Sequence, residues 1–376
     1  MTLPVRSDTL RVLMPTPRYY PSMGGVETHV AQVARRLTQV GVDITVLTPD
    51  PTGTMPAHEC IDGVTVVRVP AWPRQRDWYF SPDIYRIVGK GEWDLIHCQS
   101  YHTFVAPMAM LAAQQANIPY VVTFHGGGSS SWFRNTIRQM QWKLLGPLLQ
   151  RAARLIAIAK FEIALYGQAL DLPESRFTLI PNGCDIIDVP IPASDLSHPL
   201  IISVGRLERY KGHHRVIEAL PMVLEHVPEA RVRIVGSGPY EDVLRHLAER
   251  LGIASQVEIG SIPPTERRCM AETMASASLV TLLSDYETHP IAALEALALK
   301  RPVLVAATSG LAELAERGLV RAIPLKSTPE QVAFAIIDQL RQPLIPPPVE
   351  LPTWDACAAD LLALYRTVVA RQLCGS

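Results

Sequence analysis

The chain has 376 residues, more than one hydrophobic core usually supports, so two domains are expected. Hydrophobic residues make up 48% and charged residues 19%, a composition that excludes a disordered chain. The 35 Lys and Arg residues against 36 Asp and Glu leave a net charge of −1, so no basic excess indicates nucleic-acid binding. The 6 cysteines form no CxxC pair, which favours reduced thiols over a disulfide frame or a zinc site. Because the N-terminus lacks a secretion-signal pattern and no apolar run reaches ~18 residues, we expect a cytoplasmic protein.

Short apolar runs alternate with amphipathic stretches along the first half of the chain. The runs are nearly continuous in hydrophobicity, as strands covered on both faces are. Strands are predicted at residues 10–15, 42–47, 64–69, 93–97, 120–124 and 155–159, with helices at 26–40 and 103–116. This alternation predicts right-handed βαβ crossovers and a parallel sheet.

A proline-rich stretch at residues 189–200 has no helical period and is predicted to be the interdomain linker. The alternation then resumes, which predicts a second α/β domain. Strands are predicted at 200–204, 232–235, 257–259, 279–283 and 303–306, and the chain ends in an amphipathic helix at 354–372 with Thr353 as its N-cap. The economical fold is two doubly wound parallel-sheet domains that face each other across a central cleft.

Ligands of such sheets bind outside the carboxyl ends of the strands, so the loops that follow the strands are the expected binding positions. Gly24 and Gly25 lie directly before a predicted helix, whose N-terminus favours an anion. His125 directly follows the strand at 120–124, where it can donate to a sugar hydroxyl or stabilise charge. The alternative interpretations are a flexible turn and a solvent-facing loop histidine.

The loop that opens the second domain, residues 205–212, reads Gly-Arg-Leu-Glu-Arg-Tyr-Lys-Gly. Arg206 offers a bidentate fork to phosphate oxygens and Lys211 adds a second cation, a combination suited to a diphosphate. A basic surface turn is the alternative. The next strand ends at Gly236, but the following residues do not complete GxGxxG because position 241 is Glu, which weakens an NAD-dependent interpretation.

Two glutamates flank the start of a predicted helix at residues 291–300. Glu287 lies in the preceding loop, with Pro290 suited to the first helical turn and Thr288 or His289 near the cap. Glu295 lies in an apolar helical run, where an unpartnered carboxylate would be costly. Its functional interpretation is a ribose ligand, and the alternative is a structural ion pair.

Together these loops resemble the retaining nucleotide-sugar glycosyltransferases of family 4, which have the GT-B architecture of two Rossmann-like domains. The resemblance covers nearly the whole chain in the expected order. It rests on GGVE at 24–27, the His125 loop, IPNGCD at 180–185, the loop at 205–212, VGSGP at 235–239, and the Glu287 and Glu295 pair. It implies an N-terminal acceptor domain at 1–190 with the helix at 354–372 crossing back to it, and a donor domain at 199–345.

The resemblance also implies a role for each of these positions. Arg206 and Lys211 would hold the donor diphosphate, Glu287 the transferred sugar, and Glu295 the ribose. His125 would lie by the sugar, which makes Glu287, His125, Arg206 and Lys211 the expected catalytic residues. The remaining expected donor contacts are Gly24 and Gly25 by the diphosphate and the acceptor, Gly205 and Gly236, Ser261 and Ile262 at the base, and the backbone of Thr288, His289, Pro290 and Ile291.

The expected reaction moves a hexose from a UDP- or GDP-sugar to a glycan, lipid-linked or small-molecule acceptor, with retention of configuration. The chain has no Asp-x-Asp motif, so no metal or other cofactor is expected, and protein cations would stabilise the leaving group. The family often has Glu-Gly-Phe-Gly where this chain has Glu287-Thr288-His289-Pro290. Because side chains replace a bare backbone there, a non-catalytic sugar-nucleotide-binding scaffold stays an alternative. An epimerase and a periplasmic binding protein fit the residues less well.

A basic, aromatic stretch at residues 132–154 follows the His125 loop. No acidic residue lies between positions 95 and 161, while arginines and lysines accumulate beside Trp132, Phe133 and Trp142. Such a helix can lie on anionic lipid, which predicts weak peripheral contact with the inner face of the membrane. An ordinary solvated helix face that packs on the sheet is the alternative.

Overall fold

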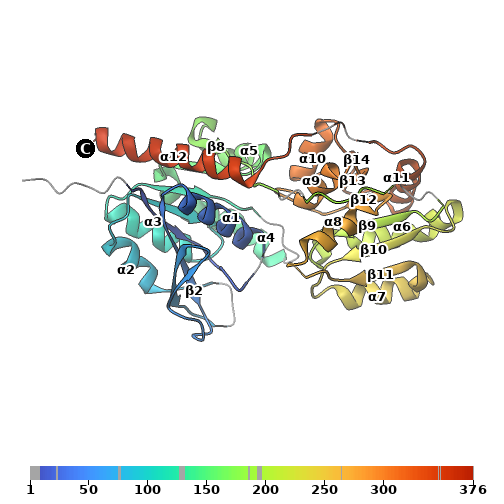
Figure 1. The fold of residues 1–376 in the computed structure, drawn as a ribbon, viewed down its shortest axis with the longest axis horizontal. Helices are drawn as coiled ribbons and strands as arrows, with labels where there is room; N and C mark the ends of the chain where they lie inside the picture. The colour runs from blue at the N-terminus through green and yellow to red at the C-terminus, as the bar shows by residue number, and fades with distance from the viewer. Residues whose placement is uncertain are drawn as a thin grey trace, which may run out of the picture. The chain divides into compact units, whose positions relative to one another are not determined.

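The computed structural model describes residues 9–22, 24–74, 78–126, 132–184, 187–192, 197–263, 265–345, 347 and 349–375, and it contains two compact units. The first unit includes the described residues up to Gly126, Thr136–Gly183 and the chain from Pro352 onward. The second unit includes Cys184–Leu351. Each unit is built around its own sheet (Figure 1).

The first unit contains an eight-stranded sheet in the order β3-β4-β2-β1-β5-β6-β7-β8. Its β3 pairs antiparallel with β4, and the other pairings of these strands are parallel. The strands are β1 (Arg11–Pro15), β2 (Asp43–Asp50), β3 (His58–Ile61), β4 (Val64–Pro70), β5 (Leu95–Gln99), β6 (Tyr120–Thr123), β7 (Arg154–Ala157) and β8 (Phe177–Leu179).

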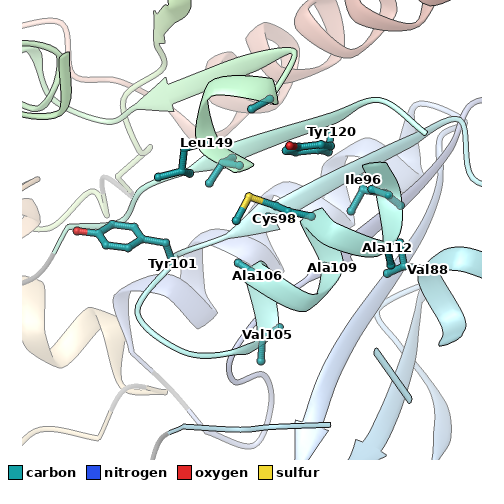
Figure 2. Close-up of a cluster of buried hydrophobic side chains, with 14 of the residues drawn as sticks. Val88, Ile96, Cys98, Tyr101, Val105, Ala106, Ala109, Ala112, Tyr120 and Leu149 are labelled. Carbon is teal, nitrogen blue, oxygen red and sulfur yellow. The ribbon is translucent and has the colours of Figure 1, made fainter. Parts of the chain in front are cut away.

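Helices cover both faces of this sheet. Successive strand residues point to opposite faces, and because both sets of side chains are apolar, both faces must be buried. On β1, Leu13 belongs to one buried cluster, while Val12 and Met14 belong to the other. Figure 2 shows part of the first cluster, where Ile96 and Cys98 of β5 face the small residues of α3. The helices of the first unit are α1 (Gly25–Gln39), α2 (Pro82–Lys90), α3 (Val105–Gln115), α4 (Trp132–Arg151, which belongs to this unit from Thr136 onward), α5 (Lys160–Leu170) and α12 (Trp354–Gly375).

The last helix, α12, packs against α1 within the first unit (Figure 1). Its inner face buries Trp354, Leu361 and Tyr365 in the same cluster as the apolar face of α1. The Thr353 hydroxyl accepts a hydrogen bond from the Ala356 amide at 3.1 Å, which confirms Thr353 as the predicted N-cap. Residues from opposite ends of the sequence therefore share one core.

The second unit contains a six-stranded parallel sheet in the order β11-β10-β9-β12-β13-β14. The strands are β9 (Leu200–Val204), β10 (Arg231–Val235), β11 (Val257–Gly260), β12 (Leu279–Leu282), β13 (Val303–Ala306) and β14 (Arg321–Ile323). Helices α6 (His213–His226), α7 (Glu241–Arg250) and α11 (Pro329–Arg341) contribute to one buried cluster, and α8 (Arg267–Ala275), α9 (Ile291–Ala298) and α10 (Ser309–Glu316) contribute to the other.

The predicted strands are confirmed to within a few residues at their ends, and the described part of the chain contains three further strands. Of the three, β8 and β14 have only three residues each, and β3 is half exposed at the sheet edge, so none carries a strong hydrophobic run. The division between the units falls between Gly183 and Cys184, and Cys184 and Val189 are buried in the second unit's core.

Most of the stretch at 132–154 forms α4, which contains Trp142. The Trp142 indole packs against the core of the first unit and donates to the Tyr101 hydroxyl at 2.8 Å, so it is held by the protein. The side chains of Trp132 and Phe133 lie outside the described residues, as do those of the other positions through 140. No helix in the described part of the chain is both long and apolar enough to cross a membrane.

Candidate functional site

The second unit has a topological switch point between β9 and β12. The chain runs from β9 outward to β10 and β11, then returns to form β12 on the other side of β9. The loops that leave β9 and β12 therefore start side by side at the carboxyl edge of the sheet, the position where doubly wound folds bind ligands. The Asp285 amide, in the loop after β12, donates a hydrogen bond to the Tyr210 carbonyl, in the loop after β9, at 2.7 Å.

Gly212 allows the two loops to approach this closely. It has a left-handed backbone with φ of 74°, and a Cβ placed there would lie 1.9 Å from the Leu283 carbonyl oxygen. Both the backbone angle and the contact exclude a side chain at this position. Gly212 is also the N-cap of α6 and follows the short 3₁₀ turn Arg209–Lys211.

This close packing brings Lys211 to Glu287. The Lys211 ammonium lies 2.5 Å from Oε1 of Glu287, and the same oxygen accepts a hydrogen bond from the Ser284 hydroxyl at 3.1 Å. The two charged side chains are only 16% and 14% exposed. Burial lowers the pKa of Lys211, but the Glu287 carboxylate, together with Tyr210 and Glu208, outweighs burial, so the pKa is raised above its ordinary value. Lys211 is therefore a fixed cation at the switch point.

The Glu287 loop is also anchored by the next strand-edge loop. The Glu287 amide donates to the Ser309 hydroxyl at 2.8 Å, and the Gly310 amide donates to the Glu287 carbonyl at 2.8 Å. Ser309 itself has a left-handed backbone with φ of 42°, which is uncommon outside glycine. The loops after β9, β12 and β13 thus hold the Glu287 backbone at one edge of the sheet.

Arg206, the other predicted phosphate ligand, is arranged differently. Its side chain is 69% exposed and forms an ion pair with Glu208 at 3.1 Å. The backbone beside it is fixed, since the Leu207 amide donates to the Ser237 carbonyl at 2.9 Å. Gly205 and Gly236 pack closely there, because a Cβ on Gly236 would lie 1.9 Å from the Gly205 carbonyl oxygen. The structure therefore brings Lys211, but not Arg206, into contact with Glu287.

Glu295 lies on α9 and forms an ion pair with Arg267 of α8 at 2.5 Å. The contact corresponds to the structural interpretation of Glu295, and its carboxylate is 14% exposed. The two side chains line a pocket together with further residues of α8 and α9 and with Ile187 and Leu299.

The other predicted donor contacts are placed along the same sheet edge. Ser261 is exposed directly after β11, and Ile262 is half-buried against the core. Thr288 and Pro290 are buried, while His289 and Ile291 are half-buried. Pro290 is the N-cap of α9, one position before the first helical turn where it was expected, and Thr288 and His289 directly precede it, near the cap as predicted.

In the first unit, His125 directly follows β6. It is 7% exposed and has a left-handed backbone with φ of 45°, and its Nε2 lies 2.7 Å from Oε1 of Gln99 at the end of β5. Its ring packs edge-on against His29 with the ring centres 4.6 Å apart. Burial, followed by the neighbouring histidines His29 and His97, lowers the pKa of His125 well below its ordinary value, so the ring is neutral.

Gly24 and Gly25 lie at the start of α1, where Gly24 is the N-cap. The Glu27 carboxylate folds back toward this N-terminus, so that a Cβ on Gly24 would lie 2.6 Å from its Oε2. Glu27 forms an ion pair with Arg18 at 3.1 Å. A Cβ on Gly25 would meet no atom within 4 Å, so this glycine leaves open space at the helix N-terminus.

The sequence analysis did not identify His213, whose buried ring binds the backbone of the Arg206 loop. The ring accepts a hydrogen bond from Ser203 at Nδ1 (2.8 Å) and donates from Nε2 to the Arg206 carbonyl (3.2 Å). Burial, with Lys211 as a further cause, lowers the pKa of His213 to about 4. The sequence feature that could have indicated His213 is its position as the first residue of the helix that follows the predicted diphosphate-binding loop at 205–212.

Chemically, this arrangement can hold an anion and a polyol. Lys211 supplies a positive charge, Arg206 an exposed guanidinium on the same loop, and Glu287 a carboxylate able to accept hydrogen bonds from hydroxyl groups. Within the described ranges, no group of three His, Cys, Asp or Glu side chains is placed to bind a metal ion.

Comparison with known families and structures is consistent with this geometry. The chain matches the model of Glycosyltransferase Family 4 over residues 23–187 and that of Glycosyl transferases group 1 over residues 188–348. It is 26% identical over 392 residues to the D-inositol 3-phosphate glycosyltransferase of Nocardiopsis dassonvillei, covering 92% of this chain and 90% of that protein.

Solved structures share the fold across the whole chain. The sucrose-phosphate synthase of Thermosynechococcus elongatus superposes with a TM-score of 0.74 at 19% identity, covering 96% of this chain and 100% of that one. HepE of Anabaena, solved in complex with UDP-glucose, gives a TM-score of 0.68 at 19% identity, with 98% and 100% coverage. At these identities the likeness is one of fold, namely the GT-B fold.

Proposed function

The chain belongs to the family 4 type of glycosyltransferases, and from that premise we propose that it moves a hexose from a nucleoside-diphosphate sugar to a hydroxyl of a glycan, lipid-linked or small-molecule acceptor. The proposal includes retention of configuration and independence from a metal ion. Its main support is the ion pair of Lys211 with Glu287 at the switch point between β9 and β12.

In the proposed reaction the bond from the sugar's anomeric carbon to the diphosphate breaks, and a bond to the acceptor oxygen forms on the same face. Positive charge grows on the sugar ring while negative charge grows on the diphosphate. Lys211 and Arg206 would stabilise the diphosphate, with the N-terminus of α9 as a further favourable dipole. The acceptor's proton would go to an oxygen of the leaving phosphate, so that charge and atoms balance.

Glu287 would hold the sugar rather than attack it. Its carboxylate is fixed by Lys211 and Ser284, so it can accept hydrogen bonds from sugar hydroxyls in a constant position. Glycosidases instead need two carboxyl groups that flank the scissile bond. Glu295, the second glutamate of the motif, is engaged with Arg267, which supports positioning roles for both.

Metal independence is supported by the charges available to the donor. The sequence has no Asp-x-Asp motif, and the protein supplies cations in the loop after β9. A lysine held by an ion pair keeps its proton at neutral pH, because its pKa is raised. Addition of EDTA would therefore leave turnover unchanged.

The test is a panel of UDP-, GDP- and ADP-sugars, screened first for thermal stabilisation and then for release of the nucleoside diphosphate. Glu287→Gln should lower turnover of the best donor by roughly 100-fold or more, the size of a lost transition-state contact. The matched control is Glu229→Gln, because Glu229 is exposed elsewhere in the second unit. Full turnover by Glu287→Gln would contradict the assignment.

The same panel separates an enzyme from a scaffold. A non-catalytic sugar-nucleotide-binding protein is the alternative suggested by the Thr288, His289 and Pro290 side chains, of which Thr288 and Pro290 are buried beside Glu287. It predicts donor binding without release of the nucleoside diphosphate, with or without an acceptor. Release of the nucleoside diphosphate by the unmodified protein would exclude it.

A further inference from the structure

The contact of His125 with Gln99 fixes which ring nitrogen carries the proton. Nε2 of His125 lies 2.7 Å from Oε1 of Gln99, and an amide oxygen can only accept a hydrogen bond. Nε2 must therefore donate, and it carries the proton of the neutral ring. The lone pair is then on Nδ1.

The orientation of the Gln99 amide is itself determined by its buried surroundings. Its nitrogen lies 3.2 Å from both ring nitrogens of His97. If the amide were reversed, its oxygen would lie against the electron-rich face of the His97 ring. In the observed orientation an N–H group of the amide is directed at that face instead. Gln99 is fully buried, so water does not compensate a reversed amide.

His97 is in turn held from two directions. Its Nδ1 lies 2.5 Å from the Tyr365 hydroxyl, and its Nε2 lies 2.7 Å from the Thr123 hydroxyl. His97, Thr123 and Tyr365 are all fully buried. The chain of contacts therefore runs from Tyr365 on α12 through His97 and Gln99 to His125, entirely within the first unit.

We propose that Gln99 is a positioning residue, which holds His125 as the Nε2-protonated tautomer so that Nδ1 accepts a hydrogen bond from a hydroxyl group of the sugar substrate. The substrate half of this proposal rests on the proposed function. It reverses the sequence expectation that His125 donates to the sugar. The left-handed backbone of His125 is a further sign that its surroundings determine its position.

The tautomer is measured directly by long-range proton–nitrogen NMR correlation on full-length protein carrying ¹⁵N-labelled histidine, without substrate. The chain has 11 histidines, and the His125 signals are assigned by their loss in His125→Asn. We expect a protonated Nε2 and a lone-pair Nδ1 for His125 in the unmodified protein. Protonation of Nδ1, or a mixture of both forms, would overturn the proposal.

Gln99→Met removes the acceptor while keeping the length of the side chain. We expect a mixture of His125 tautomers and a fall in kcat of roughly 10-fold to 100-fold, the equivalent of one or two lost hydrogen bonds. The matched control is Gln339→Met, because Gln339 is a fully buried glutamine of the second unit. It should leave the His125 spectrum unchanged. An unchanged His125 tautomer in folded Gln99→Met would contradict the role given to Gln99.

The substrate half is tested by adding UDP-glucose and, separately, UDP to the labelled protein, or the GDP pair if that base binds. The Nδ1 signal should shift with the sugar nucleotide and not with the bare nucleotide. No shift with a bound sugar nucleotide would contradict the sugar contact. An inactive protein with the expected tautomer would instead contradict the proposed function and support the assignment of the proton.

Discussion

Gly212 and Leu283 approach so closely that a Cβ on the glycine would lie 1.9 Å from the leucine's carbonyl oxygen. This contact joins the loops after β9 and β12, which contain Lys211 and Glu287 respectively. Lys211 and Glu287 are 76 residues apart in the sequence. They meet because Gly212, next to Lys211, has no side chain and lets the two loops approach each other. Packing and chemistry are thus coupled at one residue.

Gly212→Ala should lower the free energy of unfolding by at least about 3 kcal/mol, because it adds both backbone strain and a steric overlap. Gly252→Ala is the matched control, since Gly252 has a similar φ of 71° but no atom within 4 Å of an added Cβ. Gly252→Ala should lower the free energy of unfolding by only about 1 kcal/mol. The losses of unfolding free energy in both variants are measured from their denaturant midpoints, provided that the m-value is unchanged. Equal losses in Gly212→Ala and Gly252→Ala would contradict the steric argument.

The pKa of His213 predicts a pH dependence of stability. Its folded-state pKa is about 4, below the ordinary value of 6.5, so the unfolded chain binds the proton more tightly. The stability associated with neutral His213 is complete above pH 6.5 and falls by up to about 3 kcal/mol as the pH drops toward 4. His213→Gln should flatten this dependence, and parallel curves for the two proteins would contradict it.

Most of the fold could be predicted from the sequence because its strands are buried on both faces. Such strands produce continuous hydrophobic runs, as for β1, β12 and β13, whose residues are almost all buried. The exception is a strand like β3, at the edge of the sheet, where every second residue is exposed and the run disappears. The boundary between the units was harder to predict, because only the fold reveals that Cys184 and Val189 are buried in the core of the second unit.

The site could be predicted only as a set of loops. Strand ends indicate which residues reach one edge, and Lys211 and Glu287 do meet there. The sequence could not separate Lys211 from Arg206, because their different burial depends on the folded loop. Lys211 ends a short 3₁₀ turn and contacts Glu287, whereas Arg206 lies before that turn and its side chain is exposed. It also gave no sign of the contact from Gln99 to His125, which joins the ends of neighbouring strands.

Glu295 has two candidate roles that kinetics can separate. If its carboxylate binds the ribose, Glu295→Gln should raise KM for the donor by roughly 10-fold to 100-fold, as expected for a lost hydrogen bond to a charged group. Arg267→Ala removes only the ion-pair partner and should leave that KM essentially unchanged. If both variants leave KM unchanged and lower the stability equally, Glu295 is structural.

Tyr365 should contribute to stability through its buried hydroxyl. Tyr365→Phe leaves Nδ1 of His97 without its partner at 2.5 Å, which should cost about 1 to 3 kcal/mol of unfolding free energy. Tyr85→Phe is the control, because the Tyr85 side chain is exposed and its hydroxyl contact with Gln115 lies at the surface. A loss no larger than the control's would mean that the Tyr365 hydroxyl does not hold His97.

The most direct test of the donor site is calorimetric titration of UDP and GDP into the unmodified protein, Lys211→Met and Lys326→Met. Lys326 is an exposed lysine of the same unit and serves as the charge-matched control. We predict that one nucleotide binds, that Lys211→Met weakens it by roughly 10-fold to 100-fold, and that Lys326→Met does not. An unchanged Kd in Lys211→Met would contradict a diphosphate site at the β9–β12 switch point.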